Sequence, residues 1–497
     1  GGLDYVIASI GMVGNLAYNE PGSQTGSTTR LMLLDAQSRS DLQQFYLSAA
    51  DVPESAITIG IATFLAARKV VLLVWGETKS NVLKDIIEGK VDDKVPASYL
   101  QLHKNAYAVV DLTAAQHLTR ISHPWLVSSC EWNDMLTRRA IVWLCQQTGK
   151  PILKLTNKDY NQFGLNELLA LYGSAYNVNI KIFNDLQRTI TGWPGGKPNA
   201  DDSNRPERAK PYPKRVIIFS PHPDDDVISM GGTFQRLVEQ NHDVHVAYQT
   251  SGNIAVGDDE AIRYLALMGN VLERFDPSDN ILKGKYQDMY RFLTEEKKTG
   301  DVDTIDILYL KGRIRREEAR AACRYNGVPE DRVHHLDLPF YETGKIKKGD
   351  ISENDVNIII ELLQAVKPHQ IFVAGDLADP HGTHKVCLDA ALAAIHELKN
   401  ESWMDDCRVW MYRGAWAEWE IDHIEMAVPI SPEELRRKRN SILKHQSQME
   451  SAPFLGNDER LFWQRAEERN QASANMYSKL GLASYEAIEA FVEYKKL

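Results

Sequence analysis

The stretch VIIFSPHPDDD, residues 216–226, joins an apolar run to a histidine and three carboxylates. The apolar run predicts a buried strand, and the Gly-Gly-Thr turn at 231–233 opens a helix. Ligand sites of open α/β sheets lie at the carboxyl ends of the strands. His222 and Asp225 are three residues apart on this loop, so both side chains can face one point. Imidazole and carboxylate ligands suit Zn²⁺ or another divalent metal.

A second expected strand, 370–373, is followed by Asp376 and then by DPHGTH at 379–384. The two histidines of this segment can reach the first site from a neighbouring strand end. A catalytic zinc site commonly has three protein ligands and one open position. We therefore expect one metal site formed by His222, Asp225 and His384. The alternative is that residues 221–226 form only a solvated turn with a capping aspartate.

Strands alternate with helices in two parts of the chain, which predicts parallel sheets. The first expected domain is 1–123, and the last is 213–497. Between them, 124–212 is expected to be a helical connector that ends in a proline- and glycine-rich linker. The predicted fold class is α/β, with two open, mostly parallel Rossmann-like sheets joined by this connector. The expected strands are 5–10, 70–75 and 106–111 in the first domain, and 216–219, 244–248, 334–336, 370–373, 409–412 and 424–429 in the last.

The composition disfavours some classes of binding partner. The 497 residues carry a formal net charge of −11, which disfavours binding to nucleic acids and anionic membranes. No apolar run is long enough to span a bilayer, so no membrane partner is expected. Five widely spaced cysteines without a CxxC pair predict no disulfide framework and a cytoplasmic location. The chain opens on GGLDYVIASIG, as if a strand were already under way, so we expect a piece of a longer protein.

The strand and loop at 216–233 resemble the first motif of the LmbE-like (PIG-L) de-N-acetylases, a strand followed by His-Pro-Asp-Asp-Glu. Asp226 stands in place of the glutamate. The second metal motif of that family, His-Pro-Asp-His, reads HGTH at 381–384, so both histidines match but the proline and aspartate do not. Further matching segments are TSG at 250–252, IRREEAR at 314–320, LDLP at 336–339 and HQSQ at 445–448.

This resemblance implies a zinc-dependent N-deacetylase acting on a linear amide. The implied zinc ligands are His222, Asp225 and His384. Asp224 would be the general base, because it is free to take a proton from water when its neighbour faces the metal. His381 would stabilise the oxyanion of the transition state. Arg315, in the IRREEAR segment, would contact the substrate.

The segments GGLD at 1–4, GMVGNLAYNEP at 11–21, AITIG at 56–60 and WGETK at 75–79 resemble the carboxyl-side half of glucosamine-6-phosphate deaminases. The family's catalytic loop carries Asp-Gly-His, where Val13, Gly14 and Asn15 stand here, and only Glu20 is retained. Ring opening and isomerisation need a titratable histidine held by carboxylates. Asn15 cannot carry that proton, which predicts a degenerate deaminase-like domain.

Some binding residues of the deaminases nevertheless match. Lys79 matches a phosphate-binding lysine, so Glu20 and Lys79 are expected to contact a ligand. The family's phosphate loop and enolisation base would lie upstream of Gly1. The domain is therefore expected to bind a sugar phosphate or to mediate assembly, with a homo-oligomer formed through it.

Three functions remain open at this point. The first is a zinc-dependent hydrolase that removes an acetyl group from a small N-acetylated amino sugar of the N-acetylglucosamine type, in carbohydrate metabolism. The second is a glucosamine-6-phosphate deaminase. The third is a non-catalytic module that binds sugar phosphates. Val13 and Asn15 argue against the second, and the metal-ligating set argues against the third.

Overall fold

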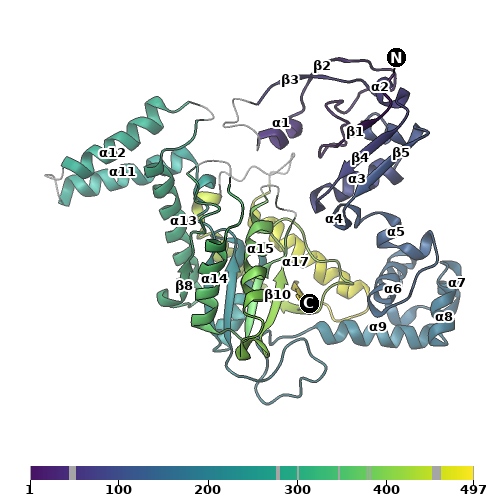
Figure 1. The fold of residues 1–497 in the computed structure, drawn as a ribbon. Helices are drawn as coiled ribbons and strands as arrows, with labels where there is room; N and C mark the ends of the chain where they lie inside the picture. Colours follow the sequence, from purple (N-terminus) through teal and green to yellow (C-terminus); the bar gives the residue numbers. More distant parts are fainter. Residues whose placement is uncertain are drawn as a thin grey trace. The chain divides into compact units, whose positions relative to one another are not determined.

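The computed structural model describes residues 2–43, 52–275, 280–298, 301–344, 348–377, 379, 382–449 and 460–495. The chain divides into two compact units (Figure 1). The first unit is built mainly from residues up to 131, and the second mainly from residue 132 onward. Most of the expected connector, 124–212, therefore groups with the second unit. The domain boundaries at 123 and 212 stay predictions.

The first unit contains a parallel sheet in the order β1-β4-β5, formed by β1 (Val6–Ala8), β4 (Val70–Val74) and β5 (Ala106–Val110). A separate antiparallel pair joins β2 (Arg30–Leu33) to β3 (Ser55–Thr58). The helices are α1 (Ala36–Gln43), α2 (Ile61–Ala66), α3 (Ser80–Glu88), α4 (Leu112–Ala115) and α5 (Thr119–Ser122), with short turns η2 (Glu77–Lys79), η3 (Pro96–Leu102) and η4 (Pro124–Leu126). One face of the parallel sheet packs with α2, α3, η3 and α4 in a core of its own.

The second unit is organised by a seven-stranded sheet in the order β11-β12-β10-β9-β6-β7-β8. Its strands are β6 (Arg215–Ser220), β7 (Asp243–Tyr248), β8 (Val333–His335), β9 (Gln370–Ala374), β10 (Arg408–Tyr412), β11 (Met426–Ile430) and β12 (Ala487–Glu493). The five strands from β10 to β8 are parallel. The strand β12 runs antiparallel to both β10 and β11. The predicted α/β class with mostly parallel strands is confirmed.

Helices make up most of the rest of this unit. They are α6 (Asp134–Thr148), α7 (Asn157–Gln162), α8 (Asn166–Tyr172), α9 (Ala175–Thr189), α10 (Asp225–Glu239), α11 (Asp258–Phe275), α12 (Asn280–Arg291), α13 (Ile305–Tyr325), α14 (Glu353–Val366), α15 (Thr383–Glu397), α16 (Pro432–Ile442) and α17 (Phe462–Lys479). Shorter turns are η5 (Ile152–Lys154), η6 (Asn253–Ala255), η7 (Phe292–Glu296), η8 (Glu330–Arg332), η9 (Ser402–Met404) and η10 (Gln446–Gln448). Among the described residues, no helix is long and apolar enough to cross a membrane.

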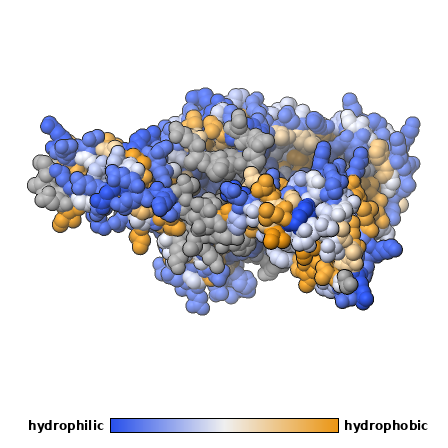
Figure 2. Space-filling model, turned by 90° about the horizontal axis from the view of Figure 1, so that it is seen from above, coloured by the Kyte–Doolittle hydropathy of each residue, from blue (hydrophilic) through white to orange (hydrophobic). Residues whose placement is uncertain are grey.

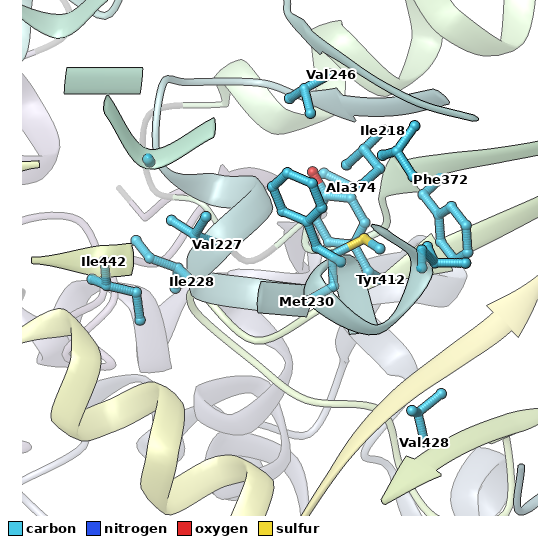
Figure 3. Close-up of a cluster of buried hydrophobic side chains, with 14 of the residues drawn as sticks. Ile218, Val227, Ile228, Met230, Val246, Phe372, Ala374, Tyr412, Val428 and Ile442 are labelled. Atoms are coloured by element: carbon cyan, nitrogen blue, oxygen red, sulfur yellow. The ribbon is translucent and has the colours of Figure 1, made fainter. Parts of the chain in front are cut away.

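Both faces of the seven-stranded sheet are covered, because successive residues of a strand point to opposite sides. From β6, Val216 and Ile218 enter one core with side chains of α10, α13, α16 and α17 (Figure 3). Ile217 and Phe219 enter the other core, with α14 and α15. Burying such a side chain contributes about 1.5 to 3 kcal/mol. This three-layer arrangement fixes β6, and with it the loop that follows.

The paired helices α11 and α12 carry large apolar side chains on their surface. A small core with α13 holds them, formed by Ala261, Leu265, Leu293 and Ile307. Large apolar side chains such as Phe275 and Ile281 stay exposed near the turn between the two helices. Figure 2 shows hydrophobic residues, in orange, among the hydrophilic surface of this part.

Three features of the fold were not expected from the sequence. These are the β2–β3 pair, helix α12 and strand β12. In addition, α16 ends at Ile442, and a separate turn, η10, follows. The β12 sequence, AIEAFVE, places Glu489 at a fully buried position, which obscures the pattern of an interior strand.

Candidate metal centre and active site

The sheet topology brings the two histidine-bearing loops together. Strands β6 and β9 are neighbours and run parallel. Their carboxyl ends therefore lie at the same edge of the sheet, which is where ligands bind in open α/β sheets. His222 and Asp225 follow β6, and His384 begins α15 after β9.

One group of the described residues has the arrangement of a metal site, namely His222, Asp225 and His384, whose donor atoms all lie within 4.8 Å of one another. The Asp225 Oδ2 atom lies 3.2 Å from His222 Nδ1 and 3.1 Å from His384 Nε2. The same oxygen accepts a hydrogen bond from the His222 backbone N–H at 2.9 Å. The predicted set therefore converges on one point.

The neighbouring chain orients His384. Its Nδ1 lies 3.1 Å from the backbone carbonyl of Asp376, which accepts the ring proton and leaves Nε2 facing Asp225. Its backbone N–H donates to Asp379 Oδ2 at 3.1 Å. Ligating histidines are typically held through their other ring nitrogen in this way, which fixes the tautomer.

The electrostatics of the three groups favour a bound cation. Burial opposes a charge on Asp225, but His384 and His222 hold the pKa of this carboxyl well below its usual range. Burial likewise opposes a charge on His384, yet the Asp225 carboxylate outweighs it and raises the pKa of His384 to about 10. The folded site thus stabilises a positive charge beside the Asp225 carboxylate. A bound divalent metal would supply such a charge. Two imidazoles and a carboxylate are a fitting donor set for zinc.

Asp224, the predicted general base, is buried in a conformation that non-glycine residues seldom adopt. Its backbone has φ 149° and ψ −25°. Its Oδ1 lies 3.1 Å from Arg315 Nη2, and the same guanidinium nitrogen donates to the Pro223 carbonyl at 2.6 Å. Burial raises the pKa of Asp224 to about 8, against the opposing effect of Arg315. Positive charge added at the neighbouring site would lower this pKa again.

Arg315 is buried directly beneath this loop, with a relative exposure of 1%. A Cβ on Gly252 would lie 3.2 Å from the Arg315 guanidinium carbon and 3.1 Å from Pro223 Cδ. Gly252 also has a positive φ of 63°, which glycine adopts without strain. The structure therefore places Arg315 against Asp224, and its contact with a substrate stays a prediction.

Asp226, which stands where the de-N-acetylases have glutamate, supports the loop from within. Tyr248 donates its hydroxyl proton to Asp226 Oδ2 at 3.0 Å. Ser220 Oγ donates to the His222 carbonyl at 2.6 Å and accepts from the Asp226 backbone N–H at 3.1 Å. These contacts tie the end of β6 to the start of α10.

Two residues beside the metal-ligating set were not expected from the sequence. The Tyr341 ring lies 6.2 Å from the His222 ring, and Lys348 lies over the Tyr341 ring at 5.6 Å. Lys348 also donates to the Thr383 hydroxyl, next to His384. The sequence around Tyr341 and Lys348 contains no metal or nucleophile motif. Only the folded chain shows that these two side chains lie beside the metal-ligating set. His381, the predicted oxyanion donor, lies outside the described residues.

Glu20 and Lys79 belong to the first unit, whereas every residue of the metal centre belongs to the second. Neither carboxylate oxygen of the buried Glu20 meets a hydrogen-bonding atom at normal distance in the part of the chain that is described, and burial raises its pKa. Asn15 accepts from the Gly11 N–H at 2.8 Å and donates to Ser38 Oγ at 3.1 Å. Asn15, which is predicted to stand where the deaminases have a catalytic histidine, is therefore a neutral amide held by hydrogen bonds.

Comparison with known proteins agrees with both halves of this description. A glucosamine-6-phosphate deaminase-like protein of Bacteroides thetaiotaomicron is 67% identical over 497 residues, which are 99% of this chain and 75% of that protein. The chain belongs to this deaminase-like family. Within this family member, residues 217–395 match the PIG-L model, described as GlcNAc-PI de-N-acetylase. The predicted resemblance to the LmbE-like proteins is thereby confirmed.

The resemblance of the N-terminal part to the deaminases is confirmed as well. The glucosamine-6-phosphate deaminase of Pseudarthrobacter chlorophenolicus is 42% identical over 118 residues, 24% of this deaminase-like chain and 46% of that enzyme. The chain thus spans less than half the length of that enzyme. Among solved structures, the N,N'-diacetylchitobiose deacetylase of Pyrococcus horikoshii is similar over 56% of this chain and 84% of its own, with 17% identity and a TM-score of 0.35.

Proposed function

We propose that this protein is a metal-dependent hydrolase that removes the acetyl group from an N-acetylated amino sugar of the N-acetylglucosamine type. The observation that carries the proposal is the convergence of His222, Asp225 and His384 beside the carboxyl of Asp224. All four residues fall within the segment that matches the PIG-L model. The proposal includes a small-molecule substrate and a cytoplasmic location.

The donor set fits Zn²⁺, which His222 Nδ1, Asp225 and His384 Nε2 would hold. Bound zinc would polarise the amide carbonyl and make water nucleophilic near neutral pH. The same donor set also accepts other divalent metals, and availability and affinity order decide which one is bound.

In the proposed reaction, Asp224 accepts a proton from the attacking water and passes it to the departing amine. The Arg315 guanidinium beside Asp224 favours the ionised carboxylate that the first of these steps needs. His381 would donate a hydrogen bond to the oxyanion as the carbonyl carbon becomes tetrahedral. The products are acetate and the free amino sugar.

The test combines metal analysis with measurement of acetate release. The purified full chain is incubated with N-acetylglucosamine, its 6-phosphate and an N-acetylated disaccharide, with and without prior chelation. Acetate release that is lost on chelation and restored by Zn²⁺ is the expected result. A metal-loaded protein that releases acetate from none of a broad panel of N-acetylated amino sugars would refute the proposal.

A second candidate, glucosamine-6-phosphate deaminase activity, is favoured by the likeness of the N-terminal part to deaminases and by the retained Glu20. Ammonia release from glucosamine 6-phosphate would support it. Asn15 and Val13 stand where that chemistry needs a histidine and its orienting acid, so we expect none. Tight binding of glucosamine 6-phosphate without either product would instead favour the non-catalytic module, with the first domain as a site of ligand binding or homo-oligomer assembly.

A further inference from the structure

Residues 444–448 lie outside the segment 217–395 that matches the family model, yet they contact α13 within the same unit. Ser447 donates to both carboxylate oxygens of Glu318, through its backbone N–H at 2.7 Å and its hydroxyl at 2.6 Å. Both residues are buried. Gln448 Nε2 donates to the Ala255 carbonyl at 3.2 Å. This segment therefore fixes α13 to the loop that contains Gly252.

Arg315 occupies the same helix face as Glu318, because side chains three residues apart in a helix are neighbours. The Arg315 guanidinium holds the Pro223 carbonyl and the Asp224 carboxyl. Any shift of α13 would move this guanidinium and with it the strained residue Asp224. Ser447 is thus connected to Asp224 through Glu318 and its helix neighbour Arg315.

His445 lies two residues before Ser447 on the same buried segment, next to this path. Its side chain has 0% exposure, and neither ring nitrogen has a hydrogen-bond partner among the residues that the structure describes. The Arg315 Nε–H is likewise buried with no partner in the described chain. Burial first, and then the charge of Arg315, lower the pKa of His445 to about 3, so the ring is neutral at neutral pH and has one acceptor nitrogen. A buried donor and a buried acceptor without partners are both energetically unfavourable, and pairing removes both penalties.

We propose that His445 is a positioning residue for the reaction, whose ring nitrogen accepts a hydrogen bond from Arg315 Nε–H in the protein in solution. Together with Ser447, it holds the guanidinium where Asp224 needs it. The active site of this chain then depends on residues 444–448 and not only on the segment that matches the family model. This inference rests on the proposed function for its kinetic test but not for its structural test.

The structural test is hydrogen exchange of the Arg315 Nε–H in the ¹⁵N-labelled full chain without added sugar, the signal being assigned from its loss in Arg315→Lys. We expect His445→Phe, which keeps a ring but no acceptor, to speed this exchange at least tenfold. His445→Gln, which restores an acceptor, should slow it again. Leu435→Ala, a buried change on α16, is the control for lost stability and should leave the exchange within twofold of wild type.

The kinetic test uses the same variants. We expect His445→Phe to lower kcat at least tenfold with KM and metal content unchanged, and His445→Gln to regain most of the loss. An unchanged exchange rate, an unchanged kcat in an active enzyme, or equal losses in His445→Phe and Leu435→Ala would overturn the proposal. A wild type without acetate release refutes the proposed function instead, and the exchange rates alone then decide the role of His445.

Discussion

Asp224 combines two properties that are rarely found in one residue, a buried carboxyl and a backbone φ of 149°. Side chains with a Cβ are strained in that region, at about 1 to 3 kcal/mol, and glycine is not. Such strain persists only where the surroundings hold it, and here Arg315 and the helix α10 do so. Strain at this position is consistent with selection for the place of the carboxyl rather than for stability.

We therefore predict that Asp224→Gly is more stable than Asp224→Ala. Both variants lose the carboxyl and its contact with Arg315, so they differ only in backbone strain and chain entropy. The free energy of unfolding should be higher for the glycine variant by about 1 kcal/mol, the reverse of the usual order. Urea denaturation of the two variants measures this difference, and the usual order would argue against the strain.

Substitutions of Asp224 and His222 should affect different properties, turnover in the first case and metal binding in the second. Asp224→Asn keeps all three donor atoms of the site, so we expect full metal content and a loss of kcat of about 100-fold or more. His222→Ala removes a donor atom, so we expect loss of the metal itself. Metal analysis of both proteins after dialysis provides the check. Equal metal content in wild type and His222→Ala would refute the assignment of this ligand.

The sequence was sufficient to predict that His222, Asp225 and His384 lie together, because their residue types and their places after two strands restrict the chemistry strongly. It was not sufficient for Arg315. The sequence did not reveal that the Arg315 side chain contacts Asp224, and its expected contact with substrate stays a prediction. Its partners come from residues about ninety positions earlier in the chain, and no local pattern reports such a contact. Tyr341 and Lys348 were missed for the same reason.

At the level of elements, β12 shows how a strand can be hidden in a sequence. Its Glu489 is fully buried and lies 2.7 Å from Lys438 Nζ of α16. The same oxygen, Oε1, also accepts from the Gly232 N–H, and Oε2 accepts from the Thr233 N–H, just after α10 is kinked at Met230. The carboxylate therefore caps a helix that restarts within α10.

Lys438→Met should be strongly destabilising, because it leaves Glu489 charged, buried and without its cation. We expect a loss of about 3 to 5 kcal/mol in the free energy of unfolding. The double variant Lys438→Met with Glu489→Gln removes both charges and should recover part of that loss. Chemical denaturation of the single and double variants measures it. A single variant as stable as wild type would mean that the pair contributes nothing.

A hydrogen bond to His242, made by Lys214 just before β6, should make the free energy of unfolding depend on pH. His242 Nδ1 accepts from the Lys214 N–H at 3.0 Å, so the ring must be unprotonated there. Burial, and then Lys214, lower the pKa of His242 from 6.5 to about 4. The unfolded chain binds this proton first as the pH falls. The contribution of His242 is thus complete above pH 6.5 and declines by about 3 kcal/mol as the pH falls toward 4.

His242→Asn keeps an acceptor for the same N–H but does not titrate. We therefore expect the free energy of unfolding of this variant to fall less steeply between pH 6.5 and 4.5 than that of wild type. Urea denaturation across this range gives both slopes. Identical slopes would show that His242 is not among the groups that cause acid destabilisation.

At the scale of the whole molecule, the two units have separate cores, and the metal-ligating set lies in one of them. Calorimetry of the full chain should therefore resolve two transitions. Zn²⁺ at about 100 times its Kd should stabilise the second unit by about 2.7 kcal/mol and leave the first unchanged. Leu83→Ala, in the core of the first unit, identifies the other transition. A zinc-induced shift of both transitions, or a shift that persists in His222→Ala, would contradict this expectation.

The position of β12 between β10 and β11 also affects the order in which the protein can be made. The metal-ligating residues at 222, 225 and 384 leave the ribosome well before residues 487–493. Until β12 emerges, β10 and β11 have no strand between them. Lys438 also lacks its ion-pair partner, Glu489, until then. The nascent chain therefore carries its full set of proposed metal ligands on an unfinished sheet with open strand edges. Chaperones have most to protect during that interval.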